Sequence, residues 1–213
     1  MTDNGDLLIC EFGPPPSMRF PFSGLLAGPL QISPRARMPF AALAAMACMA
    51  LAAACSPAYN WRTVTDAAEG YAIDLPAKPT VDERRVDIAG NALPMHVRAA
   101  HTQGAVFAIA AIDLPRDDAR LRESVVEALR GALARNVSAS PIERPVQVPV
   151  QTGAGIAGIE LVVTGAAGEA HEQRTIHAWV VGSGRHVYQA AIVAAHAPPQ
   201  EQVDQFFGSL KLQ

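Results

Sequence analysis

The histidines of this chain are candidate metal ligands, and their spacing in the sequence shows whether a known metal-binding motif is present. The six histidines are His96, His101, His171, His177, His186 and His196. No two of them have the i,i+4 spacing that places a pair of zinc ligands on one helix face. His171 and His177 could share a strand face, but at roughly 3.3 Å per residue they would lie about 20 Å apart. The spacing therefore predicts no metal site and no cofactor.

Three other patterns resemble catalytic motifs but lack the surrounding structure. Ser183 lies between two glycines, yet it joins two predicted strands, whereas a nucleophile elbow joins a strand to a helix. Residues 153–158 match a glycine-rich dinucleotide pattern but precede a predicted strand, so no helix N-terminus follows to bind phosphate. Asp117 and Asp118 are explained by helix capping rather than by acid–base chemistry. We therefore expect no catalytic residues and a domain that is not an enzyme.

The clearest hairpin in the sequence joins strands predicted over residues 174–181 and 185–194. Both runs alternate in polarity, and a glycine-rich segment connects them. If residues 183–184 form a two-residue turn, Trp179 lies opposite Tyr188.

One face of this predicted hairpin is the candidate binding face. Its residues are Trp179, Tyr188, His177 and His186. The opposite face carries small apolar residues, which suit packing beneath a helix. Two interpretations of the aromatic face stay open: a second core layer beneath another helix, or a groove for a ligand or a protein.

The remaining elements predict an α+β fold. Leu121, Val125, Leu129 and Leu133 recur every four residues, which indicates a helix from Asp117 or Asp118 to about Asn136 that docks by one side. Alternating segments before and after it predict strands, and Pro198-Pro199 opens a short last helix. We expect an antiparallel-rich sheet with one long and one short helix, preceded by an N-terminal signal or anchor helix.

An uncharged stretch from Met38 to Ala54 follows Arg35 and Arg37 and leads into Cys55. Basic residues, an apolar run and small residues, in this order, are the layout of an export signal. No cysteine follows Cys55, which excludes a disulfide and a Cys-based zinc site in the remainder. The expected organisation is residues 1–37 as a disordered tail or a mis-assigned start, 38–54 as signal or anchor, 55–60 as a tether and 61–213 as the globular domain.

The end of this stretch resembles the lipobox of bacterial lipoproteins, in which Leu and two small residues precede a Cys. Here the run is Leu51-Ala52-Ala53-Ala54-Cys55, with Ala52 in the place of the family's Leu. The resemblance implies lipidation at Cys55, and in a Gram-negative host Ser56 would favour the outer membrane. An uncleaved single-span anchor and ordinary signal cleavage stay open as alternatives. All three place the domain in the cell envelope, and the lipid-anchored form would face the periplasm.

The order of the predicted elements resembles the PsbP-like fold, which includes the DcrB-type bacterial lipoproteins. The residues that carry the resemblance are Trp61 with 70–76, Asp113-Leu114-Pro115 before the long helix, and 203–212 at the end. These motifs are structural, so the resemblance implies a PsbP-like α/β sandwich and a non-enzymatic envelope protein, and it assigns no site residue.

Charge limits the partners of the domain. The chain has a net charge of −3 and no basic run, which argues against nucleic acid. The expected partners are the membrane, through an N-terminal lipid or helix, and an envelope protein. The sequence favours a non-catalytic binding or accessory domain. The alternatives are the same domain on a single-span inner-membrane protein, and a hydrolase or metal-dependent enzyme using the histidine-bearing face, which would require three His or acidic groups to converge.

Overall fold

The computed structural model describes residues 59–213 except 89, 103, 137–138 and 168–171. The expected tail over 1–37, the signal or anchor over 38–54 and the lipidation site Cys55 lie outside the described residues. None of the helices in the described part has the length and apolar character needed to span a membrane.

The described chain folds as the α+β arrangement that the sequence predicts, with mostly antiparallel strands, one long helix and one short one. The elements are β1 (Arg62–Asp66), β2 (Tyr71–Leu75), β3 (Thr80–Ile88), β4 (Asn91–Thr102), β5 (Ala105–Asp113), α2 (Ala119–Asn136), β6 (Ile142–Val148), β7 (Ile156–Ala167), β8 (Glu172–Ser183), β9 (His186–Ala194), α3 (Gln200–Ser209) and β10 (Lys211–Leu212).

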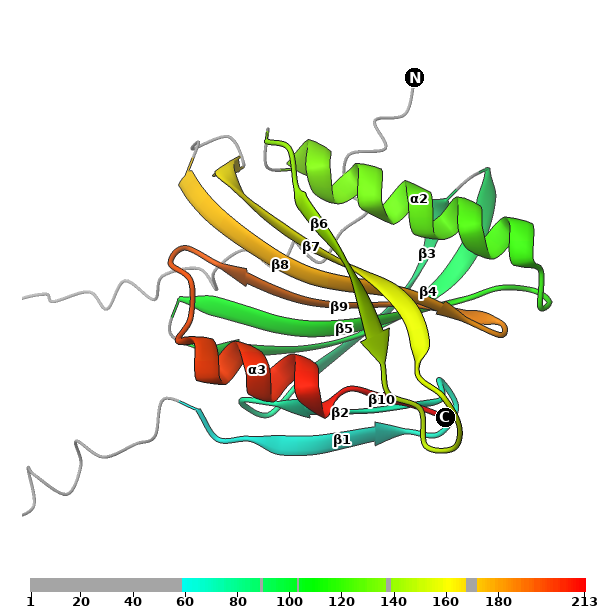
Figure 1. Ribbon diagram of the computed structural model, residues 1–213, viewed down its shortest axis with the longest axis horizontal. Helices are drawn as coiled ribbons and strands as arrows, with labels where there is room; N and C mark the ends of the chain where they lie inside the picture. Colours follow the sequence, from blue (N-terminus) through cyan, green and yellow to red (C-terminus); the bar gives the residue numbers. More distant parts are fainter. Residues whose placement is uncertain (1–58, 89, 103, 137–138, 168–171) are drawn as a thin grey trace, which may run out of the picture. The chain divides into compact units, whose positions relative to one another are not determined.

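The strands form two sheets. A 7-stranded antiparallel sheet has the order β3-β4-β5-β9-β8-β7-β6, and a 3-stranded sheet has the order β1-β2-β10. Helix α2 covers one face of the large sheet over β7, β8 and β9, while α3 and the small sheet lie on the other face (Figure 1). The middle of the large sheet is therefore buried on both sides, which explains the nearly continuous apolar run of the inner strand β5.

Helix α2 begins as its sequence predicts. The Oδ1 atom of Asp118 accepts hydrogen bonds from the backbone N–H groups of Arg120 and Leu121, so Asp118 is the N-cap. Asp117 does not cap the helix; its carboxylate pairs instead with Arg122 at 2.6 Å. The Leu and Val stripe packs on the sheet, where Leu129 and Leu133 are fully buried.

Two apolar layers hold the domain together, one on each face of the large sheet. The layer beneath α2 contains Ile176, Ala178 and Val180 from β8, the face that the sequence places beneath a helix. The layer beneath α3 and the small sheet contains Tyr71, Phe107, Ile109 and Phe206 among its buried residues. The alternation along β8 and β9 therefore assigns both faces correctly.

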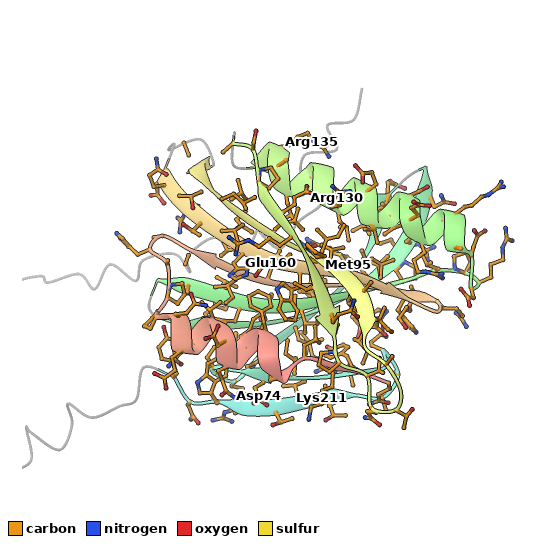
Figure 2. The ribbon with its side chains drawn as sticks, viewed as in Figure 1. Asp74, Met95, Arg130, Arg135, Glu160 and Lys211 are labelled. Atoms are coloured by element: carbon orange, nitrogen blue, oxygen red, sulfur yellow. The ribbon has the colours of Figure 1, made fainter. Side chains whose placement is uncertain are left out.

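The small sheet is attached to α3 by polar contacts as well as by its apolar face. Asp74 of β2, labelled in Figure 2, accepts a hydrogen bond from the Gln205 side chain at 2.8 Å. Its backbone N–H donates to the Ser209 hydroxyl at 2.8 Å. These contacts fix the small sheet beside α3, and thereby fix the turn between β1 and β2 over the large sheet.

The register expected for the β8–β9 hairpin is wrong. Ser183 pairs with His186, so the two-residue turn is Gly184-Arg185, and Tyr188 lies opposite Val181 rather than Trp179. Primed hairpin turns require positive φ at the first central residue, which Gly184 adopts at +54° and Ser183 would adopt only with strain. Moving the turn by one residue shifts the pairing by two, so the faces stay as predicted.

Candidate functional site

The structure divides the predicted binding face into two separate clusters. His177 and Trp179 of β8 lie beside Glu160 of β7, near α3. His186 stands at the start of β9, at the opposite end of that face, beside the turn between β1 and β2. The four predicted residues therefore share a face, as expected, but they do not form one site.

The first group is the closed cluster, defined here as Glu160, His177, Trp179 and Phe207. His177 Nε2 lies 2.7 Å from Glu160 Oε1, and the Trp179 indole N–H donates to the same oxygen at 3.4 Å (Figure 2 labels Glu160). The Phe207 ring of α3 covers both aromatic residues, with ring centroids 4.4 Å from His177 and 4.8 Å from Trp179. This half of the face packs beneath the short helix, in agreement with the core-layer interpretation.

Tyr188 is buried and connects the large sheet to the small sheet and its turn. Its hydroxyl donates a 2.7 Å hydrogen bond to the backbone carbonyl of Glu69, and its ring contacts Tyr71 edge to face. Burial raises the pKa of Tyr188 well above its usual range and that of Tyr71 to about 12. Both phenols therefore stay neutral, and Tyr188 positions Glu69 rather than lining a binding surface.

The second group is the open cluster, defined here as Glu69, His96, Asp113 and His186. Asp113 and His186 are cross-strand partners at the ends of β5 and β9, and His186 Nδ1 lies 2.8 Å from Asp113 Oδ1. His96 of β4 approaches from the neighbouring strand, with its Nε2 atom 3.7 Å from Asp113 Oδ2 and 3.7 Å from Glu69 Oε1. Glu69 Oε2 lies 3.9 Å from His186 Nδ1.

The turn that carries Glu69 is fixed on several sides. Asp66 Oδ1 accepts hydrogen bonds from the backbone N–H groups of Ala68 and Glu69. Gly70 adopts a φ of +68°, which an L side chain would disfavour. The Tyr188 hydroxyl holds the Glu69 carbonyl from the large sheet. The backbone that carries the Glu69 side chain is therefore fixed before any ligand arrives.

An ion pair joins the same turn to strand β4. The Arg98 guanidinium donates two hydrogen bonds to Asp66 Oδ2, at 2.7 and 3.2 Å. Although burial raises the pKa of Asp66, these bonds and the backbone N–H groups outweigh it and hold that pKa below its usual value. Asp66 therefore stays ionised and keeps the turn closed on β4, the strand that also carries His96.

Several buried polar atoms of the open cluster have no hydrogen-bond partner among the described residues: Glu69 Oε2, Asp113 Oδ1 and His186 Nδ1. The Glu69 side chain is only 10% exposed. The 2.8 Å contact between Asp113 and His186 is short, but its atoms are not aligned as donor and acceptor. Burial, and then the negative charge of Asp113, raise the pKa of Glu69. The charged form of Glu69 is consequently disfavoured in the folded domain.

The open cluster has the donor types of a cation site. Ligand atoms of Glu69, Asp113 and His186 all lie within 4.8 Å of one another. The side chains of Asp113, His186 and His96 are 27%, 26% and 31% exposed, so solvent reaches one side of the group. Two imidazoles and two carboxylates can bind a divalent cation, or they can exchange protons with a bound molecule.

Sequence reasoning missed the two acidic members of this group. His96 and His186 are two of the six histidines in the sequence, but no motif or spacing points to Glu69 or Asp113 as site residues. The signal present in the sequence is that Asp113 ends an apolar run that predicts a central strand. A carboxylate at that position lies beside the terminal residue of the neighbouring strand. Which residue this is can be known only from the order of the strands in the sheet.

Comparisons with known proteins add no assignment to this geometry. The chain matches no protein-family model and no curated protein.

Proposed function

We propose that this protein is a membrane-anchored envelope protein, lipidated at Cys55, whose domain acts by binding rather than by catalysis. The single observation that supports binding is the Glu69 carboxylate. It is held by a fixed turn, it is almost fully buried, and its Oε2 atom has no hydrogen-bond partner among the described residues. A buried charged oxygen without a partner is costly, so a site of this kind is maintained for a ligand.

The anchor is supported by the order of features along the chain. The uncharged run from Met38 to Ala54 and the Cys55 thiol come directly before the folded domain. Asn60 already donates a backbone hydrogen bond to Pro76, and Trp61 donates to the Gln202 side chain. A lipid at Cys55 would hold such a domain close to the membrane surface, because each buried methylene contributes about 0.8 kcal/mol.

The proposal also includes a PsbP-like α/β sandwich as the fold of the domain. What supports that likeness is the order of elements, in which strands β1–β5 precede the long helix α2, and strands β6–β9 precede the short helix α3. Folds of this breadth host many roles, so the likeness supports the architecture and leaves the ligand to be argued from the site.

Metabolic labelling of the full chain with a palmitate probe tests the anchor. We expect the wild type to incorporate label and to fractionate with membranes, and Cys55→Ala to lose the label. Cys48→Ala is the matched control and should keep it. An unlabelled wild-type protein that stays in membranes with an intact mass through Met38 would instead establish the single-span anchor. An unlabelled wild-type protein in the soluble fraction would remove the anchored function altogether.

A hydrolase is the second candidate function, because the convergence of Glu69, Asp113 and His186 is what the enzyme alternative requires. It differs from a binding domain in one measurable respect, namely turnover. An enzyme would hydrolyse chromogenic ester or phosphate substrates in a reaction that Glu69→Gln abolishes.

A further inference from the structure

We propose that Glu69, His96, Asp113 and His186 together bind one divalent transition-metal ion, with Zn²⁺ the preferred occupant. The inference deepens the proposed binding function by naming its ligand, and it does not depend on the lipid anchor.

Charge favours this assignment. Two carboxylates carry a charge of −2, which a divalent ion neutralises, while neutral imidazoles contribute lone pairs without adding charge. The combination of nitrogen and oxygen donors suits zinc and its neighbours, whereas magnesium and calcium are normally bound by oxygen alone. The donor set therefore selects for a transition metal over the more abundant hard cations.

Three of the four residues, Glu69, Asp113 and His186, have ligand atoms that lie within 4.8 Å of one another, as ligands around one centre do. With metal–ligand bonds of about 2.0–2.1 Å, neighbouring ligand atoms stand about 2.9 Å apart in an octahedral site and about 3.3 Å apart in a tetrahedral one. His186 Nδ1 lies 2.8 Å from Asp113 Oδ1 and 3.9 Å from Glu69 Oε2. His96 Nε2 lies 3.7 Å from the other oxygen of each carboxylate, Asp113 Oδ2 and Glu69 Oε1. Glu69, Asp113 and His186 thus each direct one ligand atom to a common centre. His96 is the fourth ligand, which a rotation of the two carboxylates would bring to the same centre.

The surroundings orient both imidazoles. His96 directs Nε2 toward the two carboxylates, while its Nδ1 atom lies 3.7 Å from Glu83 Oε1 on the neighbouring strand β3. A carboxylate behind a ligating histidine fixes the tautomer and ring orientation of many zinc sites. His186 stacks on the Tyr188 ring, with centroids 5.7 Å apart. Each histidine therefore has a second contact that leaves one nitrogen directed at the shared centre.

The rival explanation is a self-contained ion-pair cluster in which both histidines are protonated. A protonated His186 would donate from Nδ1 to the nearest carboxylate, and Asp113 Oδ1 is only 2.8 Å away. The two atoms are nevertheless not aligned for that bond, and neither has a hydrogen-bond partner among the described residues. Atoms that lie close together without bonding to each other are better explained as co-ligands of a missing third partner.

The test is a titration of the full chain, purified in detergent without a polyhistidine tag and stripped with a chelator. Calorimetry with Zn²⁺ alone should show saturable binding of one ion per chain, and Zn²⁺ should raise the unfolding temperature. Mg²⁺ and Ca²⁺ at the same concentration should do neither. Replacement by Co²⁺ should give visible absorption bands, which report nitrogen and oxygen ligands directly.

Variants then assign the ligands. Glu69→Gln, His96→Ala and His186→Ala should each weaken Zn²⁺ binding roughly tenfold or more and reduce the Co²⁺ bands. His196→Ala is the matched control, because His196 is exposed outside the cluster, and it should bind as the wild type does. A variant that fails to fold would be recognised by circular dichroism, and the remaining two would still decide the assignment. Absence of 1:1 binding, or equal loss in His196→Ala, would overturn the proposal.

The outcome separates this inference from the proposed function. Loss of palmitate labelling leaves the titration unchanged, because the ligands all lie in the folded domain. Conversely, a protein that is labelled at Cys55 but takes up no Zn²⁺ keeps its anchor and loses its metal site.

Discussion

The closed and open clusters share a sheet face, and each pairs histidine with glutamate, yet they differ in how their polar atoms are satisfied. In the closed cluster, Glu160 Oε1 meets both His177 and Trp179, and the Phe207 ring covers them. In the open cluster, Glu69 and His186 each keep a buried atom without a hydrogen-bond partner among the described residues. A histidine–glutamate pair is therefore no evidence of a binding site by itself, and the state of its hydrogen bonds is what separates the two clusters.

The difference has a physical origin in what each cluster packs against. The closed cluster lies under α3, whose buried Phe207 ring packs on His177 and Trp179. The open cluster lies at the end of the large sheet, beside the tightly held turn between β1 and β2. In the closed cluster the polar groups bond to one another. In the open cluster several polar atoms lie close together without a hydrogen bond among the described residues.

The largest expected effect is on stability at the closed cluster. Phe207→Ala removes a ring that is 3% exposed and uncovers His177 and Trp179. We expect a loss of about 3–5 kcal/mol in the free energy of unfolding. Denaturant unfolding measures the loss, and a red shift of tryptophan emission in the folded state reports the exposed Trp179. Zn²⁺ affinity should stay unchanged, and a large drop in it would show that the two clusters are coupled.

A smaller loss is expected from Glu160→Ala. The change leaves the Trp179 N–H and a ring nitrogen of His177 without their shared acceptor. An orphaned polar group costs about 1–3 kcal/mol when it is buried, and these two groups are half-buried, so the free energy of unfolding should fall by about 1 kcal/mol. Unfolding in the presence of a chelator measures it without interference from metal. A variant as stable as the wild type would mean that Glu160 is as poorly satisfied as Glu69.

Much of the fold follows from the sequence because it depends on local periodicity. The four-residue repeat of α2 and the alternation of β8 and β9 assign both core layers, and Asp118 caps the helix as one of two expected residues. The sequence predicts the turn of the hairpin one residue too early, since alternation fixes the face of a strand but not its register. Only the requirement for positive φ at Gly184 distinguishes the two registers.

The open cluster could not be predicted in the same way, since its members come from four elements distant in sequence. Asp113 and His186 meet only because β5 and β9 are neighbours, and Glu69 reaches them only because the small sheet packs on that face. The i,i+4 search among the histidines is sensitive to helical sites alone. A site assembled across strand ends requires the strand order, which no local pattern contains.

The last prediction concerns whether a single substitution in the open cluster raises or lowers the stability of the domain. In metal-free protein, Glu69→Gln should raise stability at neutral pH, because it removes a buried charge that faces Asp113 and has an unpartnered oxygen. With saturating Zn²⁺ the order should reverse, because the variant loses a ligand. Thermal unfolding of both proteins, with chelator and with Zn²⁺, measures the two differences.

The pH dependence of the metal-free difference follows from the pKa of Glu69. Burial, and then Asp113, raise that pKa above its ordinary value of 4.5, Asp66 adds to the rise, and His96 and His186 oppose it. The folded protein thus keeps a proton that the unfolded chain has released, so its stability falls as pH rises through this interval. The variant lacks that loss, and its advantage should be absent below pH 4.5 and grow above it. A variant less stable than the wild type in chelator at neutral pH would show that the Glu69 carboxylate is as well satisfied as that of Glu160, and the distinction between the clusters would disappear.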